Sequence, residues 1–352
     1  MTTTFNYDKP FTLESGITLP GYHLAYTTHG KLNAAGTNVI WIFHALTANS
    51  NPVEWWPGLV GEGKFFDPAK YFIICVNKPG SPYGSISPLS INPQTGKAWN
   101  HDFPVFTIRD MIRAFQNLRD HLGIKKVLMA LGGSTGGMQL LEWAIDEPDF
   151  FEHIVPIATN AALSPWAIAF NASQRMAIEA DTTWKDGTPE GGQKGLAAAR
   201  SFALISYRHY NGYGITQSRD KAFVPLTRDV EYAADNYQRY QGLKLVNRFN
   251  AVCYYRLSQS MDSHDVGRDR GGVTEALAKI TARTLVIGIQ SDVLYPIEEQ
   301  EFLQKHIPGA SLLTIASDFG HDGFLLEYER IEPALKSFME EKSSHHLKVV
   351  NE

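Results

Sequence analysis

Short and almost continuously apolar runs recur along the chain, and they alternate with segments whose apolar positions repeat every three or four residues. The runs have the length and the β-branched, aromatic character of strands that are buried on both faces. Such alternation predicts an α/β fold, with a mostly parallel central sheet flanked by helices. The predicted strands span residues 38–43, 71–76, 126–131, 153–158, 284–289 and 311–315. The best-marked helix begins near Thr107.

The pattern changes between residues 161 and 279. Strand-like runs become scarce there, and charged, glycine-containing and aromatic segments with helical spacing replace them. A loop is predicted for 186–195, and good helix formers follow it at 196–200. Strand–helix alternation resumes at Ile280. We therefore expect one core domain made of residues 1–160 and 280–352, and a helical lid insertion made of residues 161–279.

Composition narrows the class of protein. The chain has 352 residues, 43% of them hydrophobic, which is enough for a large core. Its net charge of −5 argues against a general nucleic-acid binder. No basic segment leads into an apolar run at the N-terminus, and no stretch approaches the roughly 18 apolar residues that span a bilayer. We expect a cytoplasmic protein that does not bind membranes, with Cys75 and Cys253 as buried thiols.

The strongest chemical signal is a glycine-rich turn at 132–137, with the sequence GGSTGG. It lies between a predicted strand and a helical pattern, as the nucleophile elbow of the α/β-hydrolase fold does. A serine on so tight a turn has a strained backbone, which favours glycine neighbours. The turn also directs helix N-terminal N–H groups towards an oxyanion. We predict that Ser134 is the nucleophile. A phosphate-binding loop is the alternative, although the segment lacks a P-loop lysine.

A serine hydroxyl needs a base, and that base needs an orienting acid. In this fold the chain order is serine, acid, histidine, with the last two on loops after late strands. Asp292 and His321 follow the last two predicted strands, and we predict that they are the acid and the base. Considered alone, the position of Asp292 is also typical of a helix N-cap, and that of His321 is also typical of a histidine in a surface loop. Asp318 is the next candidate for the acid.

The segment HALTAN at 44–49 directly follows the first predicted strand. In the α/β-hydrolase fold the second oxyanion N–H comes from this position. We assign the oxyanion hole to the backbone amides of Leu46 and Thr135. We interpret His44 as a buried histidine that shapes the loop, in preference to a catalytic role.

Eight segments together resemble the homoserine O-acetyltransferase family, and several of them are not shared by α/β hydrolases at large. They are HALTAN (44–49), SINPQTGK (90–97), DFP (102–104), TIRDM (107–111), GGSTGGMQ (132–139), YQG (240–242), HDVG (264–267) and GHDG (320–323). The resemblance covers residues 10 to 338. It implies acetyl transfer from acetyl-CoA to the side-chain hydroxyl of L-homoserine, a step towards methionine. It also implies a homodimer that associates through the helical insertion. Acyl transfer by a serine triad requires no metal or prosthetic group, so we expect no cofactor.

The resemblance also implies roles for single residues. The family's triad falls on Ser134, Asp292 and His321. Its carboxylate-binding arginine falls on Arg200, its tyrosine two helical turns later on Tyr207, and its amine-binding carboxylate on Asp322. General chemistry supports such roles, because an amino-acid substrate needs a fixed positive charge to bind its carboxylate and a fixed negative charge to bind its ammonium group. The spacing places Arg200 and Tyr207 on one helix face. Without the resemblance, these three residues would read as ordinary surface or half-buried positions.

Two departures from the family leave the substrates open. Ala48 stands where the family usually has glycine, and the loop 77–84 differs from the family's more glycine- and cysteine-containing version. We expect that loop close to the acyl pocket. A succinyl donor and a serine acceptor are therefore alternatives. The same triad with water as acceptor would make the protein an esterase. A catalytically silent binding protein is disfavoured by the intact triad.

Overall fold

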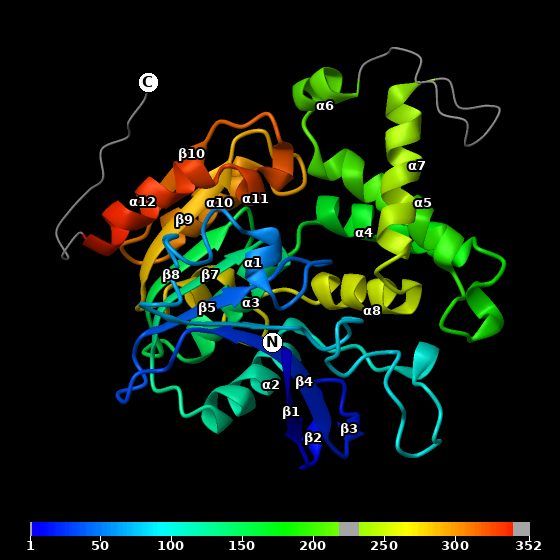
Figure 1. Cartoon of the computed structure of the whole chain (residues 1–352), viewed down its shortest axis with the longest axis horizontal. Coiled ribbons are helices and arrows are strands. Elements are labelled where there is room, and N and C mark those ends of the chain that lie inside the picture. Colours follow the sequence, from blue (N-terminus) through cyan, green and yellow to red (C-terminus); the bar gives the residue numbers. More distant parts are fainter. Residues whose placement is uncertain (1, 218–231, 341–352) are drawn as a thin grey trace.

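An eight-stranded sheet forms the centre of the molecule (Figure 1). The computed structural model describes residues 2–217 and 232–340, so the polar tail with His345 and His346 lies outside the described residues. The strand order is β1-β4-β6-β5-β7-β8-β9-β10. Strand β4 is antiparallel to both of its neighbours, and the other pairs are parallel. The predicted mostly parallel sheet is confirmed.

All six predicted strands are present, with ends that differ by a few residues. They are β5 (Val39–Phe43), β6 (Phe72–Val76), β7 (Val127–Gly133), β8 (Phe151–Ile157), β9 (Arg283–Ile289) and β10 (Ser311–Ile315). The sequence pattern missed the antiparallel edge, which consists of β1 (Thr2–Tyr7) and β4 (Tyr22–His29), and also the small pair β2 (Phe11–Thr12) and β3 (Thr18–Leu19). Strand β1 is threonine-rich and mostly exposed, so it lacks the continuous apolar run of a central strand.

Helices cover both faces of the sheet. Trp41 packs towards α2 (Ile108–His121) and α3 (Thr135–Asp146), whereas its neighbour Ile40 packs towards α12 (Tyr328–Glu340). Figure 1 shows α2 and α12 on opposite sides of the strands. Helix α2 begins where the sequence predicts, because Thr107 and Asp110 form a reciprocal capping box. The remaining core helices are α1 (Pro52–Trp55), α10 (Ile297–His306) and α11 (Gly323–Leu326).

The chain between β8 and β9 is helical in its described part. Its helices are α4 (Pro165–Glu179), α5 (Gln193–Tyr207), α6 (Tyr210–Thr216), α7 (Ala233–Val246), α8 (Ala251–Asp262) and α9 (Val273–Leu277). Helices α4 to α8 lie together beside the sheet (Figure 1). The two ends of this segment pair with each other, since Leu163 N–H donates to His264 O at 2.9 Å and Val266 N–H to Ala161 O at 3.0 Å.

Helix α5 begins at Gln193, inside the loop that the sequence predicts for 186–195. The reason is a cap from a distant residue. The Asp181 carboxylate accepts a hydrogen bond of 2.9 Å from the Gly195 N–H, in the first turn of the helix. A local sequence pattern does not reveal such a cap.

Two further expectations concern the whole chain. Cys75 and Cys253 are buried, free thiols, as expected. Within residues 2–217 and 232–340, no helix is long and apolar enough to cross a membrane.

Candidate active site

Ser134 lies on the turn between β7 and α3, with backbone angles φ 56° and ψ −126°. Few residues other than glycine adopt a positive φ, so this turn is strained. Hydrogen bonds on both sides hold it. The Ser134 N–H donates to Ile157 O at 2.9 Å, and the Thr159 hydroxyl donates to Ser134 O at 2.9 Å. The elbow is therefore fixed by the neighbouring strand β8 and the residues that follow it.

Gly136 shows why the elbow needs its glycines. A Cβ at this position would lie 2.2 Å from the backbone oxygen of Phe43, closer than any real contact. Phe43 is the last residue of β5, and it pairs with Gly132 of β7. The close approach therefore packs the start of α3 against the end of β5, where the 44–49 loop begins.

Asp292 and His321 form a buried pair. The Asp292 Oδ2 atom lies 2.6 Å from His321 Nδ1. The other carboxylate oxygen accepts hydrogen bonds from the Leu294 N–H at 2.8 Å and the Tyr295 N–H at 3.0 Å. A carboxylate only accepts hydrogen bonds, so the proton of neutral His321 resides on Nδ1, and Nε2 carries no proton and can accept one.

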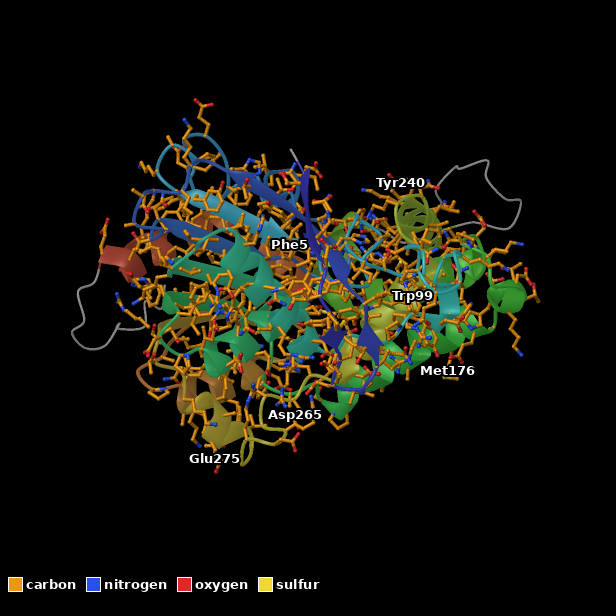
Figure 2. All side chains as sticks on the ribbon, turned by 90° about the horizontal axis from the view of Figure 1, so that it is seen from below. Phe5, Trp99, Met176, Tyr240, Asp265 and Glu275 are labelled. Atoms are coloured by element: carbon orange, nitrogen blue, oxygen red, sulfur yellow. The ribbon has the colours of Figure 1, made fainter. Side chains whose placement is uncertain are left out.

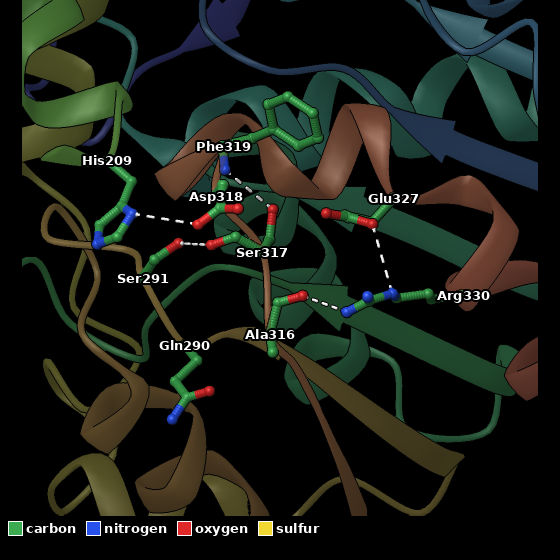
Figure 3. Close-up of a pocket in the computed structure, with 9 residues that line it drawn as sticks. All are labelled: His209, Gln290, Ser291, Ala316, Ser317, Asp318, Phe319, Glu327 and Arg330. Atoms are coloured by element: carbon green, nitrogen blue, oxygen red, sulfur yellow. Dashed lines mark hydrogen bonds and ion pairs between the residues drawn. The ribbon is translucent and has the colours of Figure 1, made fainter. Parts of the chain in front are cut away.

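Asp318, the alternative acid, lies elsewhere. Its side chain is 65% exposed, and its carboxylate lies 3.8 Å from Nδ1 of His209 instead of facing His321. Figure 3 shows both side chains in a pocket beside the loops that carry Asp292 and His321. This pocket has a volume of about 510 Å³. Its lining residues are His209, Gln290, Ser291, Ala316, Ser317, Asp318, Phe319, Glu327 and Arg330.

Three aromatic rings surround the His321 imidazole. The ring centroids of Tyr207, Tyr295 and Phe324 lie 5.6, 5.2 and 5.4 Å from that of His321. The Tyr295 hydroxyl is buried without a hydrogen-bond partner among the described residues, and burial raises the pKa of Tyr295 well above its ordinary value. Its hydroxyl therefore stays protonated. Sequence reasoning missed Tyr295 and Phe324, although each lies three residues after a predicted triad member.

Leu46 and Thr135 are both buried, at the two loops that Gly136 brings together. Within the described ranges, neither backbone N–H donates to a protein acceptor. Thr135 is the first residue of α3, so its N–H has no acceptor within the helix. Both amides are thus available to a developing oxyanion.

Arg200 and Tyr207 share one face of α5, as their spacing predicts. The Arg200 guanidinium lies over the Tyr207 ring, with its carbon 5.5 Å from the ring centroid. Among the residues that the structure describes, no carboxylate forms an ion pair with Arg200. A half-buried guanidinium without a carboxylate partner, next to a ring that contacts His321, suits an anionic ligand.

Asp322 lies beside α5 but is already paired. Its carboxylate forms an ion pair with Arg208, whose second nitrogen donates to the Tyr237 hydroxyl at 3.1 Å. Gly320 permits this contact, because a Cβ there would lie 2.7 Å from the Arg208 carbonyl carbon. Sequence reasoning missed Arg208, since nothing local indicates that a residue at the end of α5 meets the His321 loop.

Metal-ligating side chains do not cluster in the described part of the chain. No group of three or more histidine, cysteine, aspartate or glutamate side chains there could hold a metal ion.

Comparison with known proteins agrees with this geometry. The family model of the alpha/beta hydrolase fold matches residues 38–328. A curated homoserine O-acetyltransferase from Cyclobacterium marinum is 48% identical over 95% of this chain and 94% of its own length. The crystal structure of homoserine O-acetyltransferase from Bacillus anthracis superposes with a TM-score of 0.88 at 26% identity, covering 98% of this chain and 99% of that one.

An esterase has a similar structure. An acetylester hydrolase from Corynebacterium glutamicum superposes with a TM-score of 0.85 at 25% identity, covering 97% of this chain and 96% of that one. The identity to the curated acetyltransferase is far higher and extends over nearly the full length of both chains. The chain therefore belongs to the α/β-hydrolase fold family and, within it, to the homoserine O-acetyltransferases.

Proposed function

We propose that this enzyme transfers the acetyl group of acetyl-CoA to L-homoserine through an acetyl ester of Ser134, as a step of methionine biosynthesis. The observation that carries the proposal is the buried Asp292–His321 pair beside a strained serine, in a chain nearly half identical to a curated homoserine O-acetyltransferase. The chemistry requires only side chains, backbone amides and the two substrates, so we expect no metal or prosthetic group.

The first half-reaction acylates the serine. His321 Nε2 takes the proton of the Ser134 hydroxyl as the oxygen attacks the thioester carbonyl. The amides of Leu46 and Thr135 bind the oxyanion, each such donor typically being worth about 3 kcal/mol. The intermediate then collapses, the C–S bond breaks, and CoA leaves as the thiol with the proton from His321.

The second half-reaction transfers the acetyl group to homoserine. Arg200 would bind the carboxylate of the amino acid, because its guanidinium has no carboxylate partner among the described residues and lies over the Tyr207 ring, which packs against His321. Asp322 would bind the ammonium group of homoserine while its carboxylate keeps the ion pair with Arg208. The homoserine hydroxyl then gives its proton to His321 and attacks the ester, which restores Ser134.

Hydrolysis is the second candidate, supported by the likeness to the acetylester hydrolase. The surroundings of the ester favour transfer. Tyr207, Tyr295 and Phe324 pack around His321, and Ser134 itself is only 6% exposed. Water therefore has restricted access to the acyl-enzyme, whereas an amino acid bound at Arg200 would be held beside it.

A matrix of two donors and two acceptors tests the proposed reaction. Acetyl-CoA and succinyl-CoA are each offered with homoserine, with serine and with neither, and the release of free thiol is measured. We expect rapid turnover with acetyl-CoA and homoserine, and a single burst without an acceptor. Turnover that proceeds equally well without homoserine would identify a hydrolase. Preference for succinyl-CoA or serine would identify one of the related transferases.

Substitution of Arg200 by alanine should impair the second half-reaction and spare the first. The CoA ester has no amino-acid carboxylate to bind, whereas homoserine must be oriented. Losing a charge-assisted bidentate contact costs about 2–4 kcal/mol, or roughly 30- to 1,000-fold in kcat/KM for homoserine. Arg200→Lys should recover part of this loss, because lysine supplies the charge but not the planar fork. The burst of CoA without homoserine measures the first step separately.

The control for Arg200 is Arg113→Ala, which removes a guanidinium from α2, outside the proposed site. It should leave the homoserine dependence unchanged. If Arg200→Ala abolished the CoA burst while keeping normal homoserine dependence, Arg200 would belong to the CoA side of the pocket.

We also propose a homodimer that associates through the helices between β8 and β9. Large apolar side chains are exposed there, and Figure 2 shows Tyr240 on the outside of this part. Those on α5, α6 and α7 are Phe202, Ile205, Tyr210, Ile215, Tyr240 and Leu243. Contiguous exposed apolar surface marks association sites. Sedimentation of the purified protein tests the assembly.

A cytoplasmic location is consistent with the two free thiols.

A further inference from the structure

Lys78 is completely buried and lies two residues after the end of strand β6. Its Nζ donates a hydrogen bond of 2.7 Å to the backbone oxygen of His44, and its own backbone N–H donates to His44 Nε2 at 3.3 Å. His44 is the first residue of the loop that contains Leu46, and it is only 1% exposed. One lysine therefore holds both the main chain and the side chain of His44.

The contact to Nε2 decides where the His44 proton lies. Burial, with the charge of Lys78, keeps the pKa of His44 well below its ordinary value, so the ring is neutral. Since Nε2 accepts a hydrogen bond, the proton is on Nδ1, which donates to the Ala45 oxygen at 2.8 Å.

The Ala45 oxygen belongs to the same peptide unit as the Leu46 N–H. In a planar trans peptide, the C=O and N–H bonds point in opposite directions. Fixing the Ala45 oxygen therefore fixes the direction of the Leu46 N–H. The hydrogen bonds that lead to the amide assigned to the oxyanion hole therefore start at the backbone N–H of Lys78 and pass through the His44 ring, while Lys78 Nζ holds the main chain of His44 in place.

Stability does not explain this lysine. Within the described residues no carboxylate pairs with Lys78, and the titratable groups that face it are the Cys75 thiol and His44. Burial lowers the pKa of Lys78 to about 7, which reflects the cost of placing an ammonium group there. An apolar side chain of similar volume would avoid this cost, although it would leave the buried His44 oxygen without the Nζ donor. What Lys78 contributes is therefore its hydrogen bonds to His44, at the start of the 44–49 loop.

We propose that Lys78 is a positioning residue for the oxyanion hole, which sets the direction of the Leu46 N–H through its two hydrogen bonds to His44. The inference deepens the proposed function and rests on the role assigned there to the Leu46 amide. Lys78 lies in the 77–84 loop, one of the two places where the sequence departs from the family's usual pattern.

The test is Lys78→Met, which keeps most of the length of the side chain and removes the Nζ donor to His44 O, while the backbone N–H to His44 Nε2 remains. We expect the burst of p-nitrophenol from p-nitrophenyl acetate to slow about 10- to 100-fold, since loss of an entire oxyanion donor costs about 10²- to 10³-fold and a misdirected one costs less. CoA release from acetyl-CoA should slow by a similar factor, with the KM values for both substrates within about twofold. The melting temperature should stay within a few degrees of the parent value, because removal of the buried ammonium group and loss of the hydrogen bond to His44 O oppose each other. Lys70→Met, which removes an exposed lysine just before β6, is the matched control.

Two further variants complete the test. Lys78→Gln returns an N–H donor and should recover part of the rate, a rescue that a space-filling role would not predict. Lys78→Leu is the second variant without a donor, for use if methionine prevents folding. A parental burst rate in either folded variant without a donor overturns the proposal, as does failure of both to fold. If the parent enzyme itself gave no burst, the acyl-serine mechanism would be wrong instead.

Discussion

Ser134→Ala should lower kcat for acetyl transfer by about 10⁶-fold, the scale of effect seen when a triad serine is removed from other enzymes. The substitution removes one hydroxyl from a turn whose backbone is held by Ile157 O and the Thr159 hydroxyl, neither of which it changes. The melting temperature should therefore stay within a few degrees of the parent value. Mass spectrometry after mixing with acetyl-CoA alone should show one acetyl group on the parent peptide that carries Ser134, and none on the variant.

A suitable control for Ser134 is Ser260→Ala, which removes a buried hydroxyl from α8 that donates to the Arg256 oxygen. It should leave acylation unchanged. An acetyl adduct that persists on Ser134→Ala, or double-reciprocal plots that intersect where ping-pong kinetics require parallel lines, would show that the reaction does not pass through this serine.

Asp292→Asn should lower kcat by about 10⁴-fold with little change in substrate binding. The remaining Asn oxygen can still accept hydrogen bonds from the Leu294 and Tyr295 amides, as Oδ1 of Asp292 does now. The amide nitrogen would then face His321 Nδ1 and donate to it. That contact moves the imidazole proton to Nε2, where it prevents His321 from accepting the proton of Ser134. Steady-state kinetics with both substrates, together with thermal unfolding, measure the two effects separately.

Asp318→Asn provides the comparison for Asp292. Asp318 is exposed and faces His209 in the pocket of Figure 3, so its substitution should leave kcat within a few-fold of the parent. If Asp318→Asn were inactive and Asp292→Asn nearly normal, the acid would be Asp318 and the buried pair seen here would not be the working arrangement.

The sequence predicted those parts of the fold that depend on local patterns. Continuous apolar runs located the central strands, and the glycine-rich turn located Ser134. The antiparallel edge was missed because β1 buries only Phe5 and otherwise resembles a polar segment. The start of α5 was misplaced because its cap comes from Asp181, on the far side of a loop.

Contacts between distant segments could not be predicted in the same way. Arg208 contacts Asp322, and Lys78 contacts His44, only in the folded protein, because each pair joins segments that are far apart in the sequence. The order and context of Asp292 and His321 made their partnership predictable because both follow neighbouring strands. No comparable rule links the end of α5 to the His321 loop. For that reason the ion pair between Arg208 and Asp322 was not predicted.

The helices between β8 and β9 leave and rejoin the sheet at neighbouring strands, and the two ends of the segment are hydrogen-bonded to each other. During evolution the sequence and length of this segment can therefore change while its attachment points to the sheet stay in place, because its two ends are bonded to each other. Ser134, Asp292, His321 and Asp322 lie outside this segment, whereas Arg200 and Tyr207 lie within it. Changes confined to this segment could thus alter how the carboxylate of the acceptor is bound, while the residues that form the acyl-enzyme stay unchanged.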